Sequence, residues 1–240
     1  VAIGMLSTVA AAAAVGACVS ATMGFLLLRL TGLSVRAFLP SVALPNSGNI
    51  GLPLTLLAFG QDGLKLGVSY FVVIALIQHT VGYTVASGNF RIGFLLRQPL
   101  VYAVGAVLIV LFTGVQVPSF LLSTTEVLGG MMIPAMLIML GNSLAKLNVS
   151  ALRPAVITGI GRLTVGILSA VLIIEVFALS GIPAGTVFLM ATMPSAIVTY
   201  VYAQKFRPDA DQVAGAVVTS TLLTFACLPA LLWVALRLSE

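Results

Sequence analysis

The sequence predicts an all-α, polytopic membrane protein built from inverted five-helix repeats with crossed, broken helices, in which the first repeat is incomplete. Composition sets the class, because 60% of the 240 residues are hydrophobic and only 7% are charged, whereas soluble domains carry about 25% charged residues. The apolar runs extend over whole helix lengths, unlike the alternating strands of about 10 residues in transmembrane barrels. The spacing of these runs and an internal repeat predict the architecture.

Eight apolar segments are candidates to cross a bilayer, whose core takes about 20 helical residues. Charged residues, glycine and proline bound them at residues 3–30, 36–59, 63–88, 98–114, 119–145, 153–179, 184–206 and 210–237. With connections on alternate sides, one face carries Arg29, Arg36, Arg91, Arg97, Lys146, Arg153, Lys205 and Arg207, and the other only Lys65 and Arg237. The basic face is predicted to be cytoplasmic. Both ends are then expected outside the cytoplasm in a multi-pass cell-membrane protein, with a bacterial inner membrane as the expected location.

An offset of 149 residues aligns two parts of the chain without gaps. Gly32 and Pro45 correspond to Gly181 and Pro194, with the same spacing of thirteen in each pair. The segments that contain the prolines are five crossings apart and therefore run in opposite directions, as in an inverted repeat. We expect a partial first repeat of three helices over 1–88 and a complete second repeat of five helices over 89–240. Together with the Val start, this predicts a ten-helix protein whose first two helices are absent from this sequence.

The segment 36–59 contains the most informative run in the chain. Pro40, Pro45 and Pro53 lie within 14 residues together with Gly48 and Gly51, and each interior proline removes a backbone hydrogen bond and clashes with the preceding turn. A continuous helix is therefore excluded. Broken backbone at membrane depth occurs only against protein or a wet cavity. Segment 184–206 contains the second break, and the simpler alternative is that both prolines make structural kinks only.

Two broken helices in inverted halves can cross at the bilayer centre and direct half-helix N-termini at one point. Helix N-termini favour anions, because they carry unpaired N–H groups and partial positive charge. The crossing is therefore predicted to bind an anionic solute. The residues expected to bind it are Pro45, Asn46, Gly48, Asn49 and Gly51 at the first break, and Pro194, Ser195, Thr199 and Tyr200 at the second.

These two runs resemble the signatures of the auxin efflux carrier family, which includes the PIN-like carriers and their bacterial relatives. The first signature, N-x-G-N-x-G-hydrophobic-P, is matched by Asn46, Gly48, Asn49, Gly51, Leu52 and Pro53. The second is matched by Met193, Pro194, Ala196 and Ala203, while Val198 stands where many relatives have asparagine. The resemblance covers nearly the whole chain.

The resemblance implies a fold like that of the bile-acid symporters and sodium–proton antiporters. It also implies secondary transport of small organic anions, such as dicarboxylates and other weak acids, by an elevator-like movement, and a homodimer. Two alternatives stay open: a sodium- or proton-coupled symporter of the bile-acid carrier type, and a membrane receptor that binds an anion without moving it.

Three further polar residues lie within the predicted helices. Arg162 lies deep in its segment, where it must snorkel, pair or face a cavity, and it is a candidate for attracting the solute. His79 is a candidate for proton coupling or a hydrogen-bonded structural group. Asn142 can either cap a helix or contact solute.

Other classes of function lack their residues in this sequence. The chain has one histidine and no metalloprotease, Walker A, nucleophile-elbow or C-x-x-C motif, so we expect no enzyme, metal site or cofactor. Cys18 and Cys227 lie in apolar runs and are expected to be neither a disulfide nor metal ligands. The net charge of +5 is explained by the basic loops, so the expected partners are the bilayer and a small organic anion, with no nucleic acid.

Overall fold

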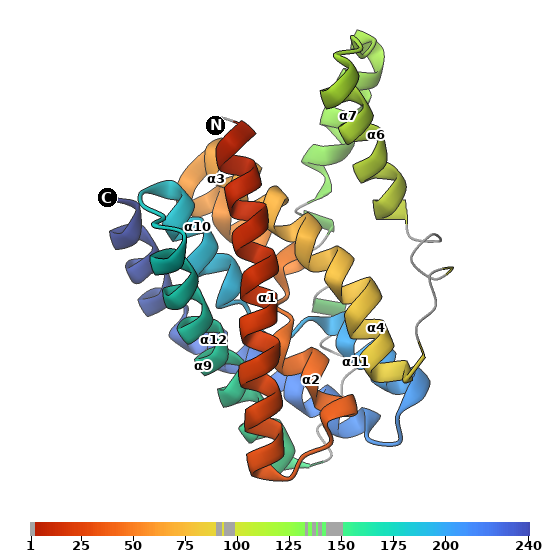
Figure 1. Cartoon of the computed structure of the whole chain (residues 1–240), viewed down its shortest axis with the longest axis vertical. Coiled ribbons are helices and arrows are strands. Elements are labelled where there is room, and N and C mark those ends of the chain that lie inside the picture. The colour runs from red at the N-terminus through yellow and green to blue at the C-terminus, as the bar shows by residue number, and fades with distance from the viewer. Residues whose placement is uncertain are drawn as a thin grey trace.

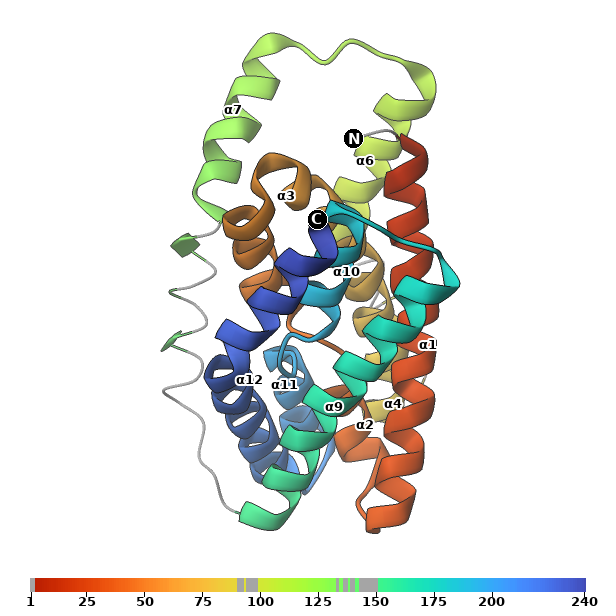
Figure 2. The same cartoon turned by 90° about the vertical axis from the view of Figure 1, so that its left-hand side faces the viewer.

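The computed structural model describes residues 3–89, 93, 99–132, 134–135, 138, 141–142 and 151–240. Nearly all of these residues are helical, and the β-structure among them is one isolated bridge between Pro45 and Ser195. The two termini lie at the same end of the molecule in both views (Figures 1 and 2). The all-helical class predicted from the apolar runs is thus confirmed.

Helices α1 (Ile3–Thr31) and α9 (Leu152–Val176) pack side by side and run in opposite directions (Figures 1 and 2). Glycines lie in this contact, since a Cβ on Gly16 would meet the Ile173 side chain and a Cβ on Gly161 would meet the Leu27 side chain, and small residues allow close helix approach in membranes. At the centre of the contact, the Ser20 hydroxyl donates to the Ser169 hydroxyl at 3.0 Å. Helix α12 (Ala210–Ser239) covers another side of α9. Each of these three helices also packs against the half-helices of the broken segments described below.

The first broken segment consists of α2 (Val35–Ala43), an extended stretch over 44–46 and a π-helical turn, η1 (Ser47–Gly51), that continues into α3 (Leu52–Ile77). The break falls where the prolines predict it, because a proline cannot donate to the preceding turn. Within α3 the backbone of Gly60 is non-helical, with φ 63° and ψ −153°. This value is available mainly to glycine, and it separates the predicted segments 36–59 and 63–88.

The chain after α3 continues through η2 (Gln78–Gly82) into α4 (Tyr83–Ser87). The second broken segment consists of α10 (Ile182–Ala191), an irregular stretch over 192–196, and α11 (Ile197–Phe206). Both breaks therefore divide a predicted crossing into two half-helices.

Four segments of the described chain are long and apolar enough to cross a membrane, namely Gly4–Thr31, Ser47–Ser87, Leu152–Val176 and Ala210–Ser239. The other predicted crossings give shorter helices, since the breaks divide two of them. Helix α6 (Pro99–Thr113) has 15 residues, and α7 (Ser119–Gly130) has 12. The loop that joins them and much of α7 extend beyond the other described helices (Figure 2). The predicted segment 119–145 extends past α7 into residues that are only partly described.

Candidate functional site

The two broken segments cross and are joined at their breaks by backbone hydrogen bonds. The Asn46 N–H donates to the Pro194 carbonyl at 2.7 Å, and the Ala196 N–H donates to the Leu44 carbonyl at 3.2 Å. These bonds form the antiparallel bridge between Pro45 and Ser195. Proline has no N–H to donate. The donor is therefore Asn46, directly after Pro45, at the first break, and Ala196, two residues after Pro194, at the second. The predicted crossing of the two breaks is therefore present in the structure.

Two half-helix N-termini begin directly at this junction, one at Ser47 in η1 and one at Ile197 in α11. The first turn of a helix leaves N–H groups without an intrahelical acceptor, and the helix dipole places partial positive charge there. Their convergence gives one side of the crossing a positive potential without a charged side chain. This is the arrangement that favours a negatively charged group.

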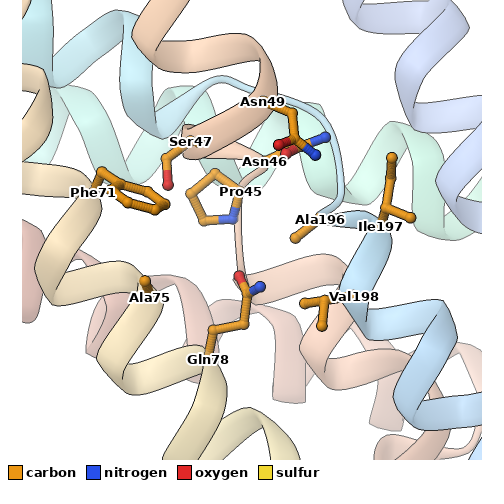
Figure 3. A pocket seen from close by; sticks show the side chains of 11 residues that line it. Pro45, Asn46, Ser47, Asn49, Phe71, Ala75, Gln78, Ala196, Ile197 and Val198 are labelled. Atoms are coloured by element: carbon orange, nitrogen blue, oxygen red, sulfur yellow. The ribbon is translucent and has the colours of Figure 1, made fainter. Parts of the chain in front are cut away.

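A cavity of about 100 Å³ opens on this side of the crossing. Figure 3 shows the amide groups of Asn46 and Asn49 on one side of Pro45 and the Gln78 amide directed toward Pro45 from the other. The lining residues are Pro45, Asn46, Ser47, Gly48, Asn49, Phe71, Ala75, Gln78, Ala196, Ile197 and Val198. The cavity thus combines three amide side chains with the two half-helix N-termini and contains no charged residue in its lining.

Asn46 is the distinctive polar residue of the cavity. It is only 5% exposed, and its side-chain nitrogen has no hydrogen-bond partner within the described part of the chain. A buried donor without an acceptor costs about 1–3 kcal/mol, so natural sequences retain one mainly where a ligand or water completes it. The nitrogen itself is buried, so an acceptor oxygen in the cavity would satisfy this donor once the amide turns toward it.

Four of the sequence-predicted site residues line the cavity: Pro45, Asn46, Gly48 and Asn49. Gly48 has a steric role, since a Cβ there would lie 2.8 Å from the Phe71 ring. Gly51 is turned to the opposite side, where a Cβ would meet the Met190 sulfur at 2.6 Å. The first break therefore supplies five of the eleven lining residues, and Gly51 packs against α10.

Of the predicted residues of the second break, Pro194, Ser195 and Thr199 are buried and Tyr200 is partly buried. All four lie outside the cavity lining. The Ser195 hydroxyl donates to the Ser41 carbonyl at 2.7 Å, and the Ser41 hydroxyl donates to Thr199 at 2.9 Å. Pro194 contributes its carbonyl to the junction. Tyr200 packs against the apolar cluster around α1 and α2. The polar side chains of this break stabilise the crossing through these hydrogen bonds. Whether they also contact a solute stays a prediction.

Most of the opposite wall consists of residues that no motif in the sequence singles out. Phe71 and Ala75 from α3 and Gln78 from η2 reach the cavity at helical spacing, and α11 contributes Ile197 and Val198. The pattern in the sequence that could have indicated this wall is one aromatic, one small and one amide residue at i, i+4 and i+7, which lie on one face of a helix. These three residues face the cavity because α3 packs against the first break.

Arg162 does not line the cavity. It is 1% exposed, and its guanidinium donates to backbone carbonyls on both broken segments. Of the alternatives open for this residue, structural pairing agrees with the contacts in the structure.

His79 lies in η2 and shares a hydrogen bond of 2.6 Å between its Nδ1 and the Tyr202 hydroxyl on α11. It is half-buried beside the cavity residue Gln78 but does not line the cavity. Asn142 is exposed, far along the sequence from any lining residue. Proton coupling through His79 and solute contact by Asn142 thus stay predictions. Among the described residues, no group of three or more His, Cys, Asp or Glu is placed to hold a metal ion.

Comparisons with known proteins agree with this architecture. The model of a family described as "membrane transport protein" matches residues 84–234, which include the second break. A protein of Methanothermobacter thermautotrophicus named "uncharacterized transporter" is 30% identical over 226 residues, covering 89% of this chain and 73% of that protein. An uncharacterized transporter of Methanocaldococcus jannaschii is 26% identical over 201 residues, covering 79% of this chain and 64% of its own length. No solved structure matches.

These matches cover well over half of the chain, and they identify a transporter and not an enzyme. They also confirm the resemblance carried by the sequence signatures of the two breaks. The chain belongs to the membrane transport protein family, which is the family of the auxin efflux carriers.

Proposed function

We propose that this transporter moves small organic anions across the membrane and binds them in the cavity at the crossing of its two broken segments. The observation that carries the proposal is the buried, unpartnered amide nitrogen of Asn46 beside two converging half-helix N-termini. A carboxylate would accept from this donor, and the N-terminal dipoles would stabilise its charge. Asn49 and Gln78 supply further amide groups around the same space.

The size of the cavity favours small solutes. Its volume of about 100 Å³ is enough for several water-sized groups. This space suits a short carboxylic acid. The apolar side chains of Phe71, Ile197 and Val198 would contact the hydrocarbon part of a weak acid, while the amides contact its carboxylate.

We also infer that the fold is an inverted repeat with the boundaries 1–88 and 89–240. Three pairs of features support this inference at the sequence offset of 149. Ser20 bonds directly to Ser169, its own counterpart, as expected for residues on a pseudo-two-fold axis. Gly32 and Gly181 both have positive φ, 73° and 68°. Helix α1 and its counterpart α9 run in opposite directions (Figure 1).

This arrangement suits alternating access, in which one repeat or bundle moves against the other around a central site. We propose a location in the cell membrane with both ends of the chain outside the cytoplasm. The common position of the termini (Figures 1 and 2) supports an even number of crossings. From the family resemblance we also propose a homodimer.

The proposal is tested by uptake of radiolabelled acetate and succinate into liposomes that contain the purified protein. Asn46→Leu and Asn49→Ala each remove a cavity amide and should reduce uptake at least tenfold. Asn89→Ala, a change of an exposed asparagine, is the matched control and should leave uptake unchanged. Unchanged uptake in both cavity variants would refute the site. Binding of either acid without any flux would identify a receptor instead of a carrier.

A further inference from the structure

The buried arginine of α9 faces the side of the crossing opposite to the solute cavity. Helices α2 and α10 end there, at Ala43 and Ala191. The last carbonyls of a helix have no intrahelical donor, and the dipole places partial negative charge on them. Two such ends converge at the crossing. The junction is therefore polarised, with half-helix N-termini on one side and half-helix C-termini on the other.

Arg162 fills this negative side. Its Nε donates to the Met193 carbonyl at 3.0 Å, and its Nη1 donates to the carbonyls of Val42 at 2.8 Å and Ala43 at 3.1 Å. Its Nη2 donates to the carbonyl of Ala191. One guanidinium thus holds both broken segments, and its planar set of donors suits several oxygens at once.

No carboxylate balances this charge among the described residues. The ion pairs that the described chain contains, Lys65–Asp62 and Arg237–Glu240, are exposed. The compensation for Arg162 therefore comes from backbone carbonyls. Helix α9 also approaches the second break closely, since a Cβ on Gly166 would lie 2.6 Å from the Ala191 carbonyl oxygen. Glycine at this position lets the arginine reach the crossing.

In transporters with discontinuous helices, unwound carbonyls and half-helix C-termini are the groups that coordinate a coupling cation. In this chain a side chain occupies that position. We propose that Arg162 is the resident cation of the crossing: it fills a cage of backbone carbonyls, positions the two broken segments, and removes the need for a bound metal cation there. The inference rests on the proposed function in taking the crossing as the transport site.

The test uses the purified full chain with Arg162→Ala. Truncation opens the cage and should lower the thermal midpoint Tm by about 10 °C. Millimolar guanidinium chloride should recover most of this loss by entering the cage, and N-methylglucamine chloride at equal ionic strength should not. The matched control is Arg237→Ala, which removes an exposed cation and should show neither effect. Wild-type Tm and uptake of radiolabelled acetate should be equal in sodium and N-methylglucamine chloride.

Three results would overturn the inference: a Tm for Arg162→Ala equal to that of the control, no specific recovery by guanidinium, or a wild-type requirement for sodium. If Arg162→Ala yields no folded protein, Arg162→Lys and Arg162→Met replace it. Lysine keeps a cation at similar length and should give more monodisperse protein than methionine, and equal yields would refute the idea. Recovery of Tm by guanidinium without flux of any tested acid would keep this inference and refute the proposed function.

Discussion

The close approach of α9 to the second break makes Gly166 a position where one added methyl group should be damaging. A Cβ there would lie 2.6 Å from the Ala191 carbonyl oxygen and 3.2 Å from the Thr192 Cα. Both atoms belong to the backbone, so no side chain can rotate away. Overpacking of this kind costs about 1–3 kcal/mol. We expect Gly166→Ala to destabilise the protein by about that amount.

Two other glycines provide the comparison. A Cβ on Gly105 in α6 would meet no heavy atom within 4 Å, so alanine should stabilise that helix by about 0.5–1 kcal/mol. Gly161, also in α9, faces the end of the flexible Leu27 side chain, which can move. The expected order of stability is Gly105→Ala, then Gly161→Ala, then Gly166→Ala.

Thermal unfolding of the purified variants in detergent measures this order. The first and last differ by about 1.5–4 kcal/mol, which corresponds to roughly 3–16 °C in Tm for a protein of this size. A Tm for Gly166→Ala at or above that of Gly105→Ala would refute the reasoning, because it would mean that α9 does not approach the break as closely as the structure shows.

Three further predictions follow from single contacts. Tyr202→Phe removes the 2.6 Å hydrogen bond to His79 and should cost about 1 kcal/mol of unfolding free energy; a double-mutant cycle with His79→Phe should then give a coupling of similar size, and additivity would count against the bond. Ser20→Cys with Ser169→Cys, in a chain whose native cysteines are replaced, should form an intramolecular disulfide on oxidation, since the two hydroxyl oxygens lie 3.0 Å apart; mass spectrometry of the digested protein detects it, and its absence would contradict the contact of α1 and α9. Asn46→Leu should leave the unfolding free energy unchanged or raise it, because the lost amide nitrogen has no partner in the described chain; a clear loss of stability would show that the amide is structural.

Much of the fold was predictable because membrane helices follow local rules. The predicted segments 3–30 and 153–179 agree closely with α1 (Ile3–Thr31) and α9 (Leu152–Val176). Apolar length and flanking charge determine such helices. The predicted segment 98–114 likewise agrees with α6 (Pro99–Thr113), and the predicted segment 119–145 begins with α7 (Ser119–Gly130) and ends among residues that are only partly described.

The candidate site was predictable on one side only. Asn46 and Asn49 were identified from their own break, and both line the cavity. Ser195 and Thr199 were also chosen for their polarity, but they bond to the Ser41 carbonyl and hydroxyl. The difference arises because the rotation of α11 about its axis depends on packing, including that of Tyr200 against the α1–α2 cluster. Polarity alone does not fix which way a half-helix turns.

The sequence by itself determined that the chain crosses a membrane and where its two helices break, because apolar length and the missing N–H of proline act locally. It also indicated that the breaks are related, through the spacing of Gly32–Pro45 and Gly181–Pro194. Only the tertiary structure decided which groups complete the broken ends. Arg162 is 120 residues from the Val42 carbonyl that it binds. A local sequence pattern cannot pair a buried arginine with helix ends that are so far away in the chain. That pairing exists because folding brings two negative helix ends to one buried point.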